Sequence, residues 1–281
     1  MRWLALHAHA VVMEPLLWSI ALVYASQSQR LTTRASAIYL ERILGRRPGL
    51  WDLHRHTNMF AHVFVDRVKL LSGGLDRFNL QVRGQDLIRR QHASGCGGVL
   101  VGAHFGSFEA LRAFDRMLPG LQVHYLMYPE HATISTGLLN QLNPSVAERI
   151  IPLQDGQTAM LQVFEALNNG DFVAFLGDRL VDTSIRGQIQ VPFLGDTIKV
   201  PTSPYIAAMA ARVPLFFCTA PRLGKDHYAI EFSMLYDGSP VDRAERDDRI
   251  AALAESYTAK LDDMCRRYPY NWFNFFDIWS E

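Results

Sequence analysis

The sequence predicts an α/β fold, a single domain with a mostly parallel central sheet flanked by helices, plus an N-terminal helical extension. Three observations predict it. Short runs of β-branched and aromatic residues recur from residue 97 onward, helix-like stretches separate them, and the chain before residue 75 shows helical patterns. Alternation of strands and helices is typical of parallel sheets, because a crossover helix connects each strand to the next.

The first part of the chain, residues 1–75, is expected to be a helical, membrane-associating extension. Residues 10–25 are strongly apolar, but Glu14 and Pro15 interrupt them, and the remaining run is shorter than the about 20 residues that span a bilayer. We expect a helix that lies in the membrane interface or packs on the body of the protein, with an ordinary core helix as the alternative. Two more helices are expected at 34–45 and 50–73, each followed by Gly or Pro signals.

Residues 76–281 are expected to form the α/β domain. No repeat, low-complexity tract or linker divides this part of the chain. The predicted strands are 97–103, 121–127, 149–153, 171–177, 213–220 and 228–232, and the predicted helices are 107–117, 131–142, 157–169, 203–213 and 242–268.

Composition excludes several classes of protein. The formal net charge of the 281 residues is zero, so the chain has no electrostatic footprint for nucleic acid. The three cysteines, Cys96, Cys218 and Cys265, form no metal-binding spacing, which indicates a reducing compartment and no structural zinc.

The stretch VGAHFGSFEALRAF, residues 101–114, carries the strongest chemical signal. His104 follows a predicted strand and precedes a predicted helix, which places it at the carboxyl end of the sheet, where sites form in such folds. Glu109 follows five residues later. If His104 lies in the turn before the helix, Glu109 can reach Nδ1 and orient the ring as a general base. Gly106 and Ser107 keep this turn small, which leaves room for a reacting group.

A persuasive enzyme nucleophile is missing from the sequence around His104, since no G-x-S-x-G elbow and no nearby cysteine accompanies it. A base without a nucleophile favours direct transfer, in which His104 deprotonates an acceptor that attacks an activated acyl carbonyl. The same base can instead activate water, and a short motif of this kind also occurs as a purely structural contact.

HFGSFE (104–109) resembles the His-x4-Asp/Glu signature of the lysophospholipid acyltransferase superfamily, and most closely its branch of bacterial lipid A biosynthesis (late) acyltransferases. GDFVAFLGDR (170–179) and VPFLGDTIKVPTSPYIAAMAARVPLFF (191–217) are similar to later segments of that family in the same order. NWFNFFDIW (271–279) resembles a related subgroup of acyltransferases for specialised lipids. The similarity extends over roughly residues 30–281.

This resemblance implies the transfer of a fatty acyl group from a thioester of acyl carrier protein or coenzyme A to a hydroxyl of a lipid-like acceptor. It implies His104 as the general base and Glu109 as its orienting partner, with no metal or redox cofactor. The implied location is the cytoplasmic face of the bacterial inner membrane, as a peripheral or monotopic protein.

Six further residues are candidates for substrate binding. Arg179 follows a second strand end, and we expect it to hold a phosphate, a carboxylate or the developing oxyanion, or else to pair with its neighbour. Ser107 is expected to cap the helix or to contact substrate. The full set of substrate-binding candidates is Ser107, Asp178, Arg179, Arg186, Phe193 and Gly195.

Two other functions remain open at this point. One is a thioesterase or lipid hydrolase that uses the same His104, and the other is a non-catalytic lipid-binding protein on the same fold.

Overall fold

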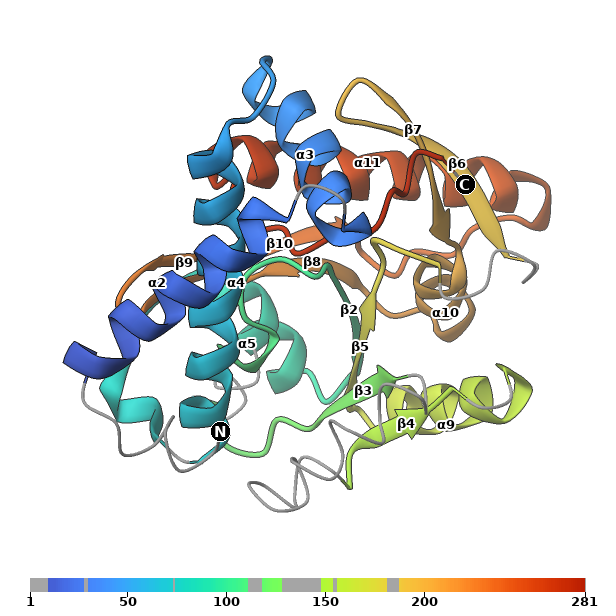
Figure 1. Cartoon of the computed structure of the whole chain (residues 1–281). Helices are drawn as coiled ribbons and strands as arrows, with labels where there is room; N and C mark the ends of the chain where they lie inside the picture. The colour runs from blue at the N-terminus through green and yellow to red at the C-terminus, as the bar shows by residue number, and fades with distance from the viewer. Residues whose placement is uncertain are drawn as a thin grey trace.

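The computed structural model describes residues 10–27, 30–72, 74–110, 118–127, 148–153, 156–180 and 187–280. A central sheet runs through the molecule with helices on both sides (Figure 1). Its strand order is β1-β10-β8-β2-β5-β3-β4, and β9 pairs with β10. The predicted α/β class with its N-terminal helical region is therefore confirmed.

The elements have the following bounds. The strands of the sheet are β1 (Asn79–Arg83), β2 (Gly98–Gly102), β3 (Val123–Met127), β4 (Ile150–Pro152), β5 (Phe172–Leu176), β8 (Leu215–Thr219), β9 (Arg222–Gly224) and β10 (His227–Tyr236), and a separate hairpin consists of β6 (Gln188–Phe193) and β7 (Asp196–Pro201). The helices are α2 (Ala10–Ser26), α3 (Leu31–Leu44), α4 (Leu50–Leu71), α5 (Gln85–Ala93), α9 (Gly156–Asn168), α10 (Ser203–Ala211) and α11 (Arg246–Arg267), with short 3-10 turns η1 (Gly74–Arg77) and η2 (Arg243–Glu245).

The middle of the sheet is parallel, as predicted. Strands β8, β2, β5, β3 and β4 all run in one direction, whereas β10 is antiparallel to β8 and β1 is parallel to β10. The carboxyl ends of β2 and β5 lie side by side, because Gly102 pairs with Leu176 at the last position of both strands. Residues that directly follow these two strands are therefore brought together.

Each face of the sheet is covered by its own hydrophobic core. Alternate residues of β2 divide between the two: Val99 and Val101 pack with residues of α9, α10 and α11, whereas Leu100 packs with residues of α4 and α5. Burial on both faces explains why the central strands are continuous apolar runs, which is the pattern that made them recognisable in the sequence.

Several elements differ from the sequence-based expectation. β1, α5 and the β6–β7 hairpin were not predicted. β1 is an edge strand of sequence NLQVR with no fully buried residue, so its hydrophobic signal is weak. The predicted helix 107–117 begins at residue 108 and is described only to residue 110, and the predicted helix 131–142 lies outside the described residues.

The N-terminal helices pack on one another and on the sheet. α2 lies across α4 (Figure 1), and the Trp18 carbonyl of α2 is 3.1 Å from Nε2 of His54 in α4. α4 in turn buries Val63, Leu70 and Leu71 in the core that it shares with the sheet. None of the helices in the described ranges is long and apolar enough to cross a membrane. The proposed division of the chain at residue 75 stays a prediction.

Candidate active site

The most conspicuous polar contact at the carboxyl edge of the sheet joins His104 and Asp178. Gly102 and Leu176 are paired at the ends of β2 and β5, and His104 and Asp178 each follow two residues later. Equal offsets from a paired register place two side chains next to each other. The parallel pairing of β2 with β5 is thus the local reason for this contact.

Asp178 makes two hydrogen bonds with His104. Its Oδ1 is 2.9 Å from the ring Nδ1, and its Oδ2 accepts the backbone N–H of His104 at 3.0 Å. An ionised carboxylate only accepts hydrogen bonds, so Nδ1 carries the ring proton and Nε2 keeps the lone pair of the neutral ring. The carboxylate is 1% exposed and the imidazole 33% exposed. Among the described residues none hydrogen-bonds to Nε2, so this atom is available to a substrate.

The electrostatics favour an ionised Asp178. Burial by itself would raise the pKa of this carboxyl, but the electrostatic interaction and the hydrogen bonds with His104, together with the neighbouring Arg179, lower the pKa well below its ordinary value. The carboxylate is therefore charged at neutral pH. An ionised partner on Nδ1 holds one tautomer and stabilises the ring once it takes a proton, which is what a general base requires.

The structure corrects the predicted contact between Glu109 and His104. The carboxylate on the ring is Asp178, whereas Glu109 forms an ion pair with Arg67 of α4, with Oε1 2.8 Å from Nε. Glu109 lies in the helical turn that begins at Phe108, so its side chain turns toward α4. Side chains five residues apart point in different directions once a helix has begun. Glu109 is 6% exposed, and Arg67 supplies its compensating charge.

A second buried polar group connects α4 to the sheet nearby. Asp66 accepts hydrogen bonds from Arg222 Nε at 2.9 Å and from the Tyr228 hydroxyl at 3.0 Å. Lys69 approaches its other oxygen at 3.2 Å. Buried charges are tolerated when they are paired in this way, so the group fixes α4 on the sheet.

The small turn after His104 is closed by backbone contacts at Gly106. Gly106 has φ +65°, and a Cβ at this position would lie 1.8 Å from the carbonyl oxygen of Ala220. Ser107 is fully buried, and its hydroxyl accepts the backbone N–H of Ala110 at 3.1 Å. Ser107 therefore caps the helix, and its hydroxyl offers no surface to a substrate.

Arg179 follows Asp178 and lies close to the same edge. Its guanidinium carbon is 4.8 Å from the centre of the Phe276 ring, and Nη2 is 3.4 Å from the Phe273 carbonyl oxygen. Burial lowers the pKa of the guanidinium, and Asp178 partly offsets this effect. Nε is buried without a hydrogen-bond partner among the described residues. The predicted role of Asp178 as a substrate-binding residue changes to that of the His104 partner, while Arg179 keeps donors for an anion. Arg186 lies outside the described residues.

Phe193 and Gly195 belong to the β6–β7 hairpin, and among the described residues no hydrogen bond or ring contact joins either of them to His104. Leu194 and Gly195 form the two-residue turn, with φ of +49° and +81°. Positive φ at both positions suits the twist of such hairpins and explains the glycine. The Leu194 N–H donates to Asp262 of α11 at 3.1 Å, so the turn rests on that helix. Phe193 is 2% exposed, and its ring packs in an aromatic cluster with Trp272 and Trp279.

Sequence reasoning missed one important member of the site, Trp272. Its indole N–H donates to Asp178 Oδ2 at 3.0 Å. Trp272 is fully buried, whereas Phe276 is partly buried. Nothing in the local sequence marks the indole as a partner of a residue 94 positions away.

An apolar pocket lies on the sheet face that carries α5. It encloses about 400 Å³, open space at its mouth included. Phe108, four residues after His104, is part of its wall, and the other lining residues are Ile88, Leu100, Leu121, Val123, Tyr125, Phe172, Ala174, Cys218 and Phe232. The apolar lining, rather than the size of the pocket, is the feature that suits a hydrocarbon ligand.

Candidate metal ligands and the Cys218 thiol bear on other kinds of chemistry. The described ranges contain no group of three or more His, Cys, Asp or Glu side chains arranged to hold a metal ion. Cys218 is buried, and burial raises the pKa of its thiol to about 12, which makes it a poor nucleophile at neutral pH.

The chain matches a known protein family. The family model described as bacterial lipid A biosynthesis acyltransferase matches residues 66–279, a range that includes His104, Asp178 and Trp272. A search of curated proteins finds no match.

Proposed function

The chain belongs to the bacterial lipid A biosynthesis acyltransferase family, and we propose that it transfers a fatty acyl group from a thioester to a hydroxyl of a lipid-like acceptor, with His104 as the general base. The family match supports acyl transfer to a lipid-like acceptor. The observation that carries the assignment of the base is the contact between His104 Nδ1 and the buried carboxylate of Asp178, 2.9 Å apart.

In the proposed reaction, Nε2 of His104 accepts the proton of the acceptor hydroxyl. The oxygen attacks the thioester carbonyl carbon, and the thiolate leaves. Asp178 stabilises the imidazolium, which returns its proton to the leaving thiolate. General base catalysis of this kind contributes about 10²- to 10⁴-fold to a rate.

Two further features of the site suit the substrates. The apolar pocket bordered by Phe108 is proposed to hold the acyl chain, and Arg179 is proposed to bind an anionic group of a substrate or the developing oxyanion. Exchange of the pocket residue Ala174 for Leu is expected to slow transfer of long acyl chains more than of short ones, because the larger isobutyl side chain shortens the available space. Equal slowing for all chain lengths would remove the pocket from the proposal.

The decisive experiment measures acyl transfer directly. The purified protein in detergent is incubated with a radiolabelled acyl carrier protein thioester, or with the coenzyme A thioester, and a total lipid extract. We expect a labelled lipid that is missing with His104→Ala. His124→Ala is a matched control, because His124 also contacts a carboxylate, Asp171 at 3.0 Å, but near the amino ends of β3 and β5.

Each other outcome has a defined meaning. Release of free fatty acid without a labelled lipid favours the hydrolase alternative. Binding of the thioester without consumption favours a lipid-binding protein. Comparison of the two thioesters at equal concentration identifies the donor, for which the family resemblance favours acyl carrier protein.

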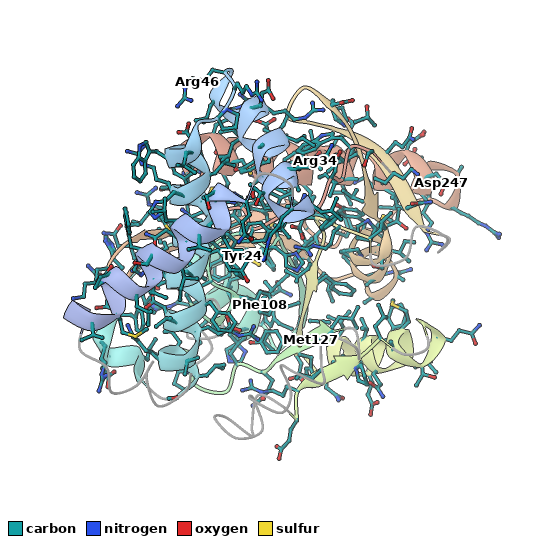
Figure 2. The ribbon with its side chains drawn as sticks, viewed as in Figure 1. Tyr24, Arg34, Arg46, Phe108, Met127 and Asp247 are labelled. Atoms are coloured by element: carbon teal, nitrogen blue, oxygen red, sulfur yellow. The ribbon has the colours of Figure 1, made fainter. Side chains whose placement is uncertain are left out.

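The N-terminal helices are proposed to bind the cytoplasmic face of the inner membrane. α2 exposes large apolar side chains that include Val12 at 58% and Val23 at 55%. Tyr24 of α2 and Arg34 of α3 lie at the junction of these helices (Figure 2). Exposed apolar and aromatic side chains beside arginines suit a surface of anionic lipids.

Vesicle binding tests this surface. We expect the protein to co-sediment with vesicles of phosphatidylcholine and phosphatidylglycerol, and less with phosphatidylcholine alone. Val23→Asp is expected to weaken binding, whereas Leu161→Asp, a change at a 70% exposed residue of α9, is the control. Equal binding by both variants would exclude α2 as the contact.

A further inference from the structure

The C-terminal segment Asn271–Phe273 pairs with the turn that carries His104. The Phe273 N–H donates to the His104 carbonyl at 2.7 Å, and the Gly106 N–H donates to the Asn271 carbonyl at 2.8 Å. These two bonds form an antiparallel bridge between Phe105 and Trp272. The position of the His104 backbone is thus set by a segment at the far end of the chain.

The side chain of Trp272 reaches the other half of the pair. Its Nε1–H donates to Oδ2 of Asp178 at 3.0 Å, the same oxygen that accepts the His104 backbone N–H. The indole is a donor only, so it cannot take the ring proton of His104. With Oδ2 engaged by two donors, the carboxylate plane is fixed and Oδ1 is directed at the imidazole.

Trp272 itself is held by three different elements. Its ring centroid is 4.9 Å from that of Tyr39 in α3 and 5.2 Å from that of Phe193 in β6. Its carbonyl is 2.7 Å from Nε2 of His56 in α4. Because the indole is fully buried among these contacts, it has no room to rotate away from Asp178.

We propose that Trp272 is a positioning residue for the general base, acting through Asp178, so that the C-terminal segment is part of the catalytic apparatus. This inference rests on the proposed role of His104. Packing alone does not require an indole N–H at this position, because a Phe ring could pack in the same apolar surroundings without a donor. The proposal gives this N–H a role.

The test compares Trp272→Phe with Trp279→Phe in the full-length chain. Trp279 is the matched control, because its ring centroid is 6.2 Å from that of Trp272 and its indole nitrogen has no hydrogen-bond partner among the described residues. We expect Trp272→Phe to lower kcat by about 10- to 100-fold, with KM for the thioester nearly unchanged. Trp279→Phe is expected to leave both nearly unchanged.

A double-mutant cycle separates positioning from general stability. If Trp272 acts through Asp178, Trp272→Phe should cost little further activity in the Asp178→Asn background. Additive losses would overturn the proposal, as would an equal effect of Trp279→Phe. If Trp272→Phe does not fold, replacement of Trp272 by the isosteric benzothienylalanine removes the N–H and keeps the shape, and unchanged kcat in that variant would also overturn it.

A spectroscopic readout makes the result independent of acyl transfer. In ¹⁵N-histidine NMR spectra we expect a slowly exchanging proton on Nδ1 of His104, and faster exchange of that proton in Trp272→Phe. If this change is seen but no transfer occurs, the positioning contact stands and the proposed reaction fails. If exchange is the same in both proteins, the positioning role fails.

Discussion

Replacement of Asp178 by Asn is the sharpest perturbation of the site. The carboxylate accepts three hydrogen bonds, two from His104 and one from the Trp272 indole. The amide oxygen can keep the two donors that share Oδ2, but the amide nitrogen then faces Nδ1. An N–H donor at that place favours the ring tautomer whose proton is on Nε2. In this tautomer Nε2 has no lone pair with which to accept the proton of the acceptor hydroxyl.

The expected losses differ for activity and for stability. Loss of the correct tautomer removes the contribution of the general base, so kcat should fall by about 10²- to 10⁴-fold. Each hydrogen bond to a charged group stabilises by about 1.5–3 kcal/mol, but a buried ion also costs several kcal/mol in desolvation. These two effects oppose each other when the charge is removed. Asp178→Asn should therefore fold with a stability within about 2 kcal/mol of the parent protein.

The assay measures kcat with a saturating thioester, alongside chemical denaturation of the same preparation. Glu109→Gln is the comparison, because it removes a carboxylate charge from the other candidate partner. We expect Glu109→Gln to weaken the contact with Arg67. The fold-decrease in kcat that it causes should be at least ten times smaller than the decrease caused by Asp178→Asn. If instead Asp178→Asn is nearly as active as the parent while Glu109→Gln is inactive, the assignment of Asp178 as the orienting residue is refuted.

Three further predictions concern the fold. His56 is buried, and burial lowers its pKa from 6.5 to about 4 despite its hydrogen bond to a backbone carbonyl. Because the unfolded chain binds this proton more tightly, the free energy of unfolding should fall by about 3 kcal/mol as the pH drops from above 6.5 to 4. In His56→Phe, the denaturation midpoint should change less with pH over that range. Gly106→Ala should lower the free energy of urea unfolding by about 3–5 kcal/mol, because the added Cβ would meet backbone atoms. Gly45→Ala has the same φ of +65° but no atom within 4 Å, so it should cost only about 1–2 kcal/mol. Equal losses in the two variants would exclude the close approach as the cause. Asp66→Ala leaves the Arg222 charge buried without its partner and should lower the free energy of unfolding, measured with heat and urea, by about 3–5 kcal/mol. The double exchange of Asp66→Leu with Arg222→Met should recover most of this loss. A double variant no more stable than the single variant would contradict this prediction.

The sequence was sufficient to predict a mostly parallel α/β sheet and its central strands. β2 and β5 are continuous apolar runs because both of their faces are buried, and the helix-like stretches that alternate with such runs predicted parallel pairing. The edge strand β1 and the β6–β7 hairpin were missed because half-exposed strands carry mixed residues. The sequence also predicted His104 as the base, since an ionisable residue at the end of a strand falls where sites of α/β folds form.

The carboxylate that contacts His104 was decided by tertiary structure. Glu109 is near His104 in sequence, but a helix that begins between them directs it to Arg67. Asp178 is 74 residues away and reaches the ring because the last residues of β2 and β5 are in register. That register could have been used as a signal, since both residues follow a predicted strand end.

What the sequence by itself determined is the class of fold, the position of His104 as the candidate base and the family to which its motifs point. What only the tertiary structure decided is which carboxylate holds His104 and that Trp272 fixes this carboxylate. The physical reason is that strand and helix patterns arise from local periodicity and burial, whereas a hydrogen bond between distant residues depends on how the strands align and on where the end of the chain packs.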